Sequence, residues 1–207
     1  NKGIALCIQG ELDDGIKAYD KAIRLDPNYA DASFKKGDAL RDKGKSTEAI
    51  KAYDEAIRLS PNHTAAWNNK AWAFKDLGKY KEASEAFGEA IRVDPDPIPI
   101  VTGLQWGNKA EALYELGQYD EAIQACEEAI RLHPHPAAWD TKGQALAAQK
   151  KYNESIEAYD EAIRSYPEDA EAWYHKGIAL EALGKIADAT AAFIKADELG
   201  GARPESL

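Results

Sequence analysis

The sequence has no methionine, only two cysteines and no hydrophobic run long enough to cross a bilayer. A membrane-spanning helix needs about 20 successive apolar residues, so we expect no membrane partner. The missing methionine, absent even at position 1, leads us to expect a fragment or a processed chain. Cys7 and Cys126 form no metal-type pair and no disulfide framework, which favours a reducing, cytoplasmic setting.

Basic residues are also in short supply. The chain has 26 lysines and arginines against 36 aspartates and glutamates, and its formal net charge is −10. An acidic protein of this size is repelled by phosphate backbones. We therefore expect no nucleic-acid partner and favour a basic or neutral protein or peptide. With 44% apolar residues, the composition is that of a folded chain rather than a disordered one.

A motif that ends in proline recurs along the chain with a period of about 34 residues. Tyr19 to Pro27 reads YDKAIRLDP, and Tyr53 to Pro61 reads YDEAIRLSP. Further copies run from Phe87 to Pro95, from Cys126 to Pro134, from Tyr159 to Pro167 and, more weakly, from Phe193 to Gly201. Such a period predicts an array of repeated structural units.

A second set of landmarks keeps step with this motif. A tryptophan opens four of the repeats, a glycine or alanine follows it, and another glycine comes further on, with a lysine in its place in one repeat. The tryptophans are Trp67, Trp106, Trp139 and Trp173. The small residues are Ala71, Ala110, Gly143 and Gly177, and the later positions are Gly78, Gly117, Lys150 and Gly184.

Each repeat therefore reads as two helices. Apolar residues spaced three and four apart form one buried helical face. The glycine falls where a left-handed C-cap is needed, and the proline stops the second helix. A carboxylate four residues before the arginine predicts an ion pair on the solvent face. These predicted pairs are Asp20–Arg24, Asp54–Arg58, Glu127–Arg131 and Asp160–Arg164.

The period and the pattern W-x2-x-G/A-x2-L/F…G-x-Y…A-x3-Y/F-x2-A…P resemble the tetratricopeptide repeat over essentially the whole chain. The resemblance implies an all-α fold, a right-handed α-solenoid superhelix of helix-turn-helix units, as a single array over 1–207. We place the repeats at about 1–29 (truncated), 30–63, 64–97, 103–135, 136–169 and 170–203. The last repeat lacks the solvating helix that usually ends such arrays, which again suggests a fragment.

About five extra residues, at 98–102, separate the third and fourth repeats in a proline-rich stretch. One interpretation is a longer loop. Another is an early start of the next helix, with Asp96 as its N-cap and Pro97 in its first turn. A functional interpretation is a hinge, or an apolar lip that a partner touches. The lip would consist of Ile98, Ile100 and Val101.

The resemblance implies that the first helix of each repeat lines a concave groove that holds a partner's segment. The groove positions are those that the landmark residues leave free. The residues that we predict for peptide binding are Phe34, Lys35, Asp38, Asn68, Asn69, Trp72, Lys75, Asn108, Glu111, Tyr114, Thr141, Gln144, Tyr174 and His175.

Asparagines and aromatic residues stand out among these positions. Asn69 and Asn108 share one repeat position with Asn1, and family members use such a ladder to grip an extended backbone. Other residues interrupt the ladder, so solvated polar side chains are the alternative. The aromatic groove residues are Phe34, Trp72, Tyr114 and Tyr174, which are either interface anchors or packing against the neighbouring repeat.

The family's carboxylate clamp, which binds chaperone tails, needs lysine and asparagine at set places on three consecutive first helices. The sequence does not match it. The lysine places hold Phe34, Asn68 and Gly107, and the asparagine places hold Asp38, Trp72 and Glu111. Acidic groove residues would also repel a terminal carboxylate, so we expect no chaperone-tail partner.

The sequence has no recognisable motif for metal binding, phosphate binding or nucleophilic catalysis. His133 and His135 have no accompanying ligand cluster, and neither a phosphate-binding loop nor a G-x-S-x-G turn occurs. Cys126 stands where other repeats have an aromatic ring, so we expect a buried core thiol. We therefore predict no enzyme, no metal and no cofactor.

The sequence favours a scaffold or adaptor for protein–protein interaction. One alternative is self-assembly through the two ends of the array. A regulatory arm of a larger protein is another alternative. The residues that would stack in self-assembly are Ile4, Leu6 and Ile8 at one end of the array and Phe193 and Leu199 at the other.

Overall fold

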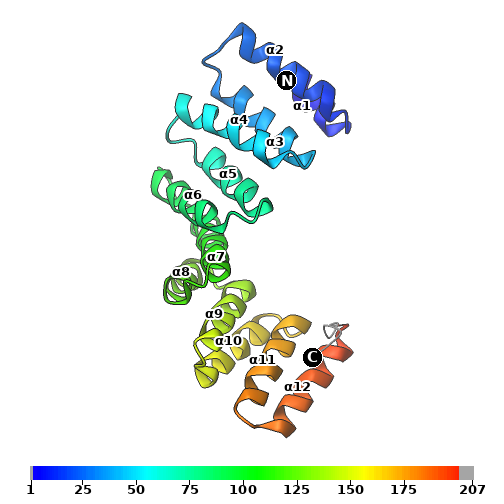
Figure 1. Cartoon of the computed structure of the whole chain (residues 1–207), viewed down its shortest axis with the longest axis vertical. Helices are drawn as coiled ribbons and strands as arrows, with labels where there is room; N and C mark the ends of the chain where they lie inside the picture. The colour runs from blue at the N-terminus through cyan, green and yellow to red at the C-terminus, as the bar shows by residue number, and fades with distance from the viewer. Residues whose placement is uncertain (1, 201–207) are drawn as a thin grey trace. The chain divides into compact units, whose positions relative to one another are not determined.

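The computed structural model describes residues 2–200, and over that range the chain forms twelve helices and no strand (Figure 1). The prediction of an all-α fold is confirmed. The first six helices are α1 (Lys2–Ile8), α2 (Leu12–Leu25), α3 (Ala30–Asp42), α4 (Ser46–Leu59), α5 (Thr64–Asp76) and α6 (Tyr80–Val93). The other six are α7 (Pro99–Glu115), α8 (Tyr119–Leu132), α9 (Pro136–Ala148), α10 (Tyr152–Ser165), α11 (Ala170–Ala182) and α12 (Ile186–Glu198).

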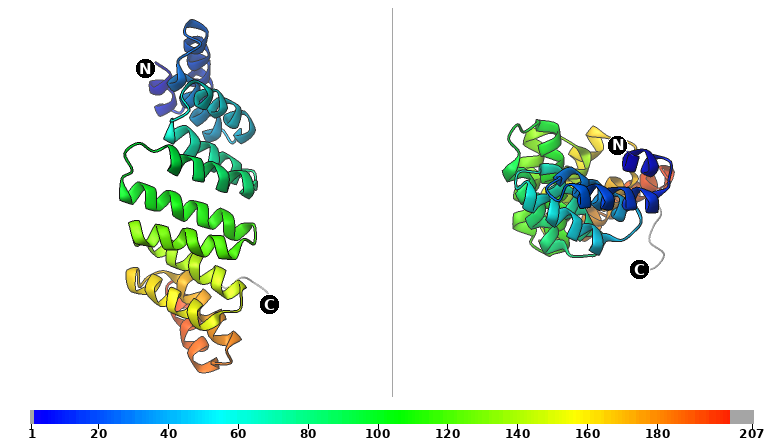
Figure 2. Two further views of the ribbon diagram at one scale, coloured as in Figure 1. Left: turned by 90° about the vertical axis from the view of Figure 1, so that its left-hand side faces the viewer. Right: turned by 90° about the horizontal axis from the view of Figure 1, so that it is seen from above.

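The helices form two compact units, an N-terminal unit at Asn1–Pro97 and a C-terminal unit at Ile98–Leu207. Within each unit every helix packs against the next along the chain, as the ribbons show (Figure 2). The first helices of successive repeats also touch: α3 contacts α5, α7 contacts α9 and α9 contacts α11. Each unit is therefore a helical repeat solenoid, in which contacts are made between neighbours. The right-handed superhelix and the repeat boundaries stay predictions.

The turn inside each helix pair has the predicted left-handed residue. Gly44, Gly78, Gly117 and Gly184 have φ values of 73°, 68°, 74° and 73°. Lys150 occupies the same place with φ 61°, although its side chain makes this conformation costly. Between pairs, proline follows the end of the second helix, as Pro61 follows α4. The period of about 34 residues is thus the distance between successive stops of the same kind, as from Gly44 to Gly78.

The two helices of a pair approach closely at a glycine. A β-carbon on Gly37 would lie 2.5 Å from Cε1 of Tyr53, and one on Gly177 would lie 2.5 Å from Cε1 of Phe193. In the fourth repeat Cys126 replaces the ring and Ala110 replaces the glycine, both in one buried cluster. The prediction of a buried thiol is confirmed, and burial raises the pKa of Cys126 to about 12.

The predicted ion pairs between each carboxylate and the arginine four residues later are wrong. The carboxylates instead meet a lysine of the next first helix, as in Lys70–Asp54 at 2.6 Å and Lys176–Asp160 at 2.6 Å. The same holds for Lys36–Asp20 and Lys142–Glu127. Four arginines, not including Arg24, pair with a glutamate three residues earlier. Those pairs are Arg58–Glu55, Arg92–Glu89, Arg131–Glu128 and Arg164–Glu161.

The extra residues between the third and fourth repeats lengthen α7, which has 17 residues. The helix starts early, but Ile98 is its N-cap and Pro99 its first residue, so the assignment of Asp96 and Pro97 is wrong. Proline suits this position because its fixed φ is helical and the first turn needs no N–H partner. None of the helices over residues 2–200 combines the length and apolarity that a membrane crossing requires.

Gly177→Ala should lower the free energy of unfolding by ~1–3 kcal/mol, because the added methyl group overpacks the contact with Phe193. Gly107→Ala is the matched control: apart from the neighbouring residues of its own helix, nothing lies within 4 Å of its added β-carbon, and alanine favours the helix by ~0.8–1 kcal/mol. Urea unfolding followed by circular dichroism measures both. Equal changes of the same sign would contradict the close-approach argument.

Lys150→Gly should raise the free energy of unfolding by ~0.5–1 kcal/mol. Glycine removes the strain of the left-handed conformation, and this gain exceeds the greater freedom of glycine in the unfolded chain. Lys51→Gly is a useful comparison because Lys51 is exposed inside α4 and should lose stability on the same substitution. A loss of stability in Lys150→Gly would show that the left-handed conformation of Lys150 is not strained.

Candidate functional site

Asp38 lies on α3 and is hydrogen-bonded to side chains of α3, α4 and α5 in the N-terminal unit. Its Oδ1 accepts hydrogen bonds from Tyr53 Oη at 3.1 Å and from Asn69 Nδ2 at 2.8 Å. Its Oδ2 accepts one from Lys35 Nζ at 3.1 Å. Burial, followed by the charge and hydrogen bond of Asp38, raises the pKa of Tyr53. Asp38, itself half-buried, therefore holds the predicted groove residues Lys35 and Asn69 together.

The Asn69 amide is already engaged on both sides. Besides donating to Asp38, it accepts a hydrogen bond from Asn68 Nδ2 at 3.2 Å. An amide has two N–H groups and two acceptor positions, so part of its capacity is left for a ligand. Asn108 makes no side-chain hydrogen bond within the described part of the chain. Asn1, the third member of the predicted ladder, lies outside the described residues.

The aromatic groove residues differ in their surroundings. Trp72 is half-buried, edge-on to Phe87 at 5.8 Å, with Lys75 Nζ over its ring at 4.6 Å. The ring of Tyr174 packs against that of Phe193, with the two ring centroids 5.5 Å apart. Phe34 was expected to be exposed and is buried, with only 8% of its surface accessible, because its ring packs 4.7 Å from the ring of His63.

In the C-terminal unit Asp140 has a comparable role. Gln144 Nε2 donates to its Oδ2 at 2.6 Å, and Nδ1 of His175 lies 3.0 Å from its Oδ1. Burial alone would lower the pKa of His175, but the hydrogen bond and charge of Asp140 outweigh it and raise the pKa. Thr141 donates to the carbonyl of Ala137 in its own helix at 2.9 Å.

A hollow of about 730 Å³ lies beside Asp140, between α7, α9 and the turns that precede α9 and α11. Its wall combines five carboxylates with the rings of Tyr114 and Tyr166, and no lysine or arginine lines it. We call it the acidic hollow. The carboxylates are Glu111, Glu115, Asp140, Asp169 and Glu171.

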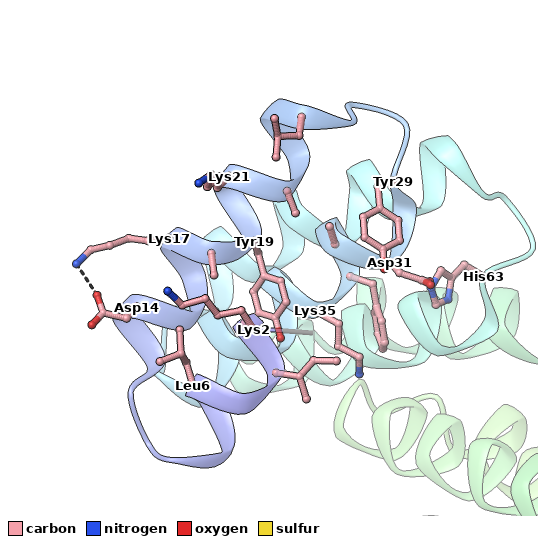
Figure 3. Close-up of a pocket in the computed structure, with 17 residues that line it drawn as sticks. Lys2, Leu6, Asp14, Lys17, Tyr19, Lys21, Tyr29, Asp31, Lys35 and His63 are labelled. Atoms are coloured by element: carbon pink, nitrogen blue, oxygen red, sulfur yellow. Dashed lines mark hydrogen bonds and ion pairs between the residues drawn. The ribbon is translucent and has the colours of Figure 1, made fainter.

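The acidic hollow brings together four of the predicted groove residues, Glu111, Tyr114, Thr141 and Gln144. Phe34 and Lys35 line another hollow, in the N-terminal unit (Figure 3). The other predicted residues line neither hollow: Asp38, Asn68, Asn69, Trp72, Lys75, Asn108, Tyr174 and His175.

Sequence reasoning missed the contribution of the turns. His135, Tyr166 and Asp169 line the acidic hollow and lie between one repeat's second helix and the next repeat's first, and Pro136, which begins α9, also lines it. Their place after the recurring motif was a usable signal. His133 and His135 have ring centroids 6.1 Å apart, and no group of three possible metal ligands gathers among residues 2–200.

The chain belongs to the tetratricopeptide repeat family. One model of this repeat matches residues 2–64 and 141–204, and a second matches 64–97 and 104–136. Among the curated proteins none matches the sequence. Membership of this family supports a general role as a scaffold for protein–protein interaction.

Solved structures share the fold. The protein MamA has 25% identity to this chain, covers 79% of it with 94% of its own length and gives a TM-score of 0.73. YrrB, described as a tetratricopeptide repeat protein with an unusual peptide-binding site, has 21% identity, 89% and 93% coverage and a TM-score of 0.72. A tetratricopeptide repeat protein from Parabacteroides merdae has 18% identity, 98% and 78% coverage and a TM-score of 0.79.

The unfolding free energy should fall as the pH rises through the folded-state pKa of His175. That pKa is raised above the unfolded value of about 6.5, so the stabilisation is complete below about pH 6.5 and is lost above the folded value. Urea unfolding across this range measures the slope. Asp140→Asn and His175→Gln should each flatten it, and an unchanged slope in both would contradict the pairing.

Proposed function

We propose that this protein is a scaffold whose acidic hollow holds a basic segment of a partner protein. The observation that carries the proposal is the composition of the wall: five carboxylates and two tyrosine rings, with no lysine or arginine. Carboxylates attract arginine and lysine, and tyrosine faces stack on them. A segment of alternating cationic and small residues has the chemistry that this surface recognises.

The geometry supports selective recognition of cations. Asp140 is held by Gln144 and His175, so its position is set before a ligand arrives. Glu115 and Glu171 are exposed at the rim, where they can attract a basic segment. The peptide-binding site named for YrrB supports a peptide ligand for this fold. The unpaired thiols Cys7 and Cys126 support our proposal of a cytoplasmic location.

Self-assembly through the ends of the array has weaker support. Ile4 and Ile8 are 41% and 81% exposed at one end. At the other end Phe193 packs against Gly177 and Tyr174 within its own helix pair, so it is not an open end face. The proposal that the chain is a regulatory arm of a larger protein is compatible with a scaffold role.

A fluorescent, end-blocked peptide of arginines separated by alanine and serine should bind more tightly than its uncharged glutamine counterpart. Glu115→Lys combined with Glu171→Lys should weaken this binding by about tenfold or more, because the rim charges reverse. Both residues are exposed, so the fold should be kept. Fluorescence anisotropy at several salt concentrations measures the affinity.

Glu85→Lys is the matched control, since Glu85 is an exposed carboxylate on α6 that does not line the acidic hollow. It should bind the arginine peptide as the unsubstituted protein does. Equal affinity for the arginine and glutamine peptides, or full binding by the double variant, would exclude the acidic hollow as the site.

A further inference from the structure

The other hollow, in the N-terminal unit, has the opposite charge. Its volume is about 850 Å³, and residues of α1, α2, α3 and the adjoining turns line it (Figure 3). Four lysines and two aspartates are among them, in a protein whose net charge is −10. We call it the basic hollow. Its lysines are Lys2, Lys17, Lys21 and Lys35.

The two aspartates and two of the lysines are already paired. Lys17 Nζ lies 2.7 Å from Asp14 Oδ1, as the dashed line in Figure 3 shows. Lys35 binds Asp38, and Asp31 faces His63 at 3.5 Å. Lys2 and Lys21 have no acidic partner within the described part of the chain. The surplus charge of the basic hollow is therefore positive.

Lys21 departs from the pattern of the other repeats. At the same position of α4, α6, α8 and α10 a glutamate pairs with the arginine three residues later. In α2 the arginine, Arg24, follows a lysine instead, so two cations replace an ion pair. Nothing in the repeat itself neutralises them, which leaves this helix face able to bind a carboxylate.

The basic hollow also presents uncovered apolar side chains. Tyr19 and Phe34 form a buried floor, each with 8% of its surface accessible. Leu25 is 78% exposed, whereas Leu59 and Leu132 at the same repeat position are half-buried. Tyr29 is 47% exposed beside it. Cations thus surround an apolar surface large enough to accept more than one side chain.

We propose that the basic hollow binds an acidic segment of another protein that also carries large apolar side chains. The apolar side chains would pack on Leu25 and Tyr29, and the carboxylates would pair with Lys21 and Lys2. The proposal goes beyond the function proposed above and does not depend on the acidic hollow. With both sites the scaffold takes two segments of opposite charge.

The probe is an end-blocked fluorescent peptide in which glutamates flank leucine and phenylalanine. It should bind the unsubstituted protein, and binding should weaken with added salt. Lys21→Glu should weaken it by about tenfold or more by reversing a central charge. Leu25→Ser should weaken it as well, because the exposed leucine supplies apolar contact. Since the other repeats have glutamate at the position of Lys21, the substitution should not harm the fold.

Lys51→Glu and Ile186→Ser are the controls, an exposed lysine on α4 and an apolar residue of α12 that is 59% exposed. Neither should change binding. Equal binding of a glutamine version of the peptide, or full binding by Lys21→Glu, would overturn the proposal. So would a sedimentation result in which the unsubstituted protein is a dimer that Lys21→Glu dissociates, because a second copy would then occupy the hollow.

The two proposals fail separately. Lys21→Glu should leave binding of the arginine peptide unchanged, and Glu115→Lys with Glu171→Lys should leave binding of the glutamate peptide unchanged. If only one of the two peptides fails to bind the unsubstituted protein, only the proposal for the corresponding hollow is contradicted.

Discussion

Each repeat depends on the close approach of its two helices at a small residue, which is glycine in repeats such as those of Gly37 and Gly177 and alanine in the fourth repeat. A ring carbon of the second helix occupies the space that a β-carbon of the first helix would need. This contact sets which face of the first helix is buried. Asp38 lies beside this buried face, because it accepts a hydrogen bond from Tyr53, whose ring packs on Gly37. Asp140 in turn binds Gln144 and His175.

Ion pairs link successive repeats in the same way each time. Lys70 and Lys176 reach back to a carboxylate on the preceding second helix while lying over the rings of Trp67 and Trp173 at 4.9 and 5.3 Å. Such partly exposed pairs contribute little stability individually. Their regular position involves acidic side chains between repeats, whereas the carboxylates that line the acidic hollow are a different set.

The landmarks in the sequence were sufficient to predict the helices, the residues that end them and the buried thiol, because each of these depends on local geometry. Side chains with two possible partners were not predictable in this way. Asp54 can meet Arg58 or a lysine of the next repeat, and only the packing of the helices decides. Phe34 was misplaced for a similar reason: the ring of His63, a turn residue of another repeat boundary, covers it. The hollows depend on such turns, so their walls were only partly predictable.

The net charge of −10 predicts a basic or neutral partner only if charge is spread evenly. The structure shows that it is not. One hollow has carboxylates and no lysine or arginine in its wall, and the other has four lysines. Screening limits the reach of each set to about 8–10 Å, so a bound segment responds to the charges of its own hollow rather than to the whole chain. For a repeat protein, partner chemistry must therefore be inferred repeat by repeat.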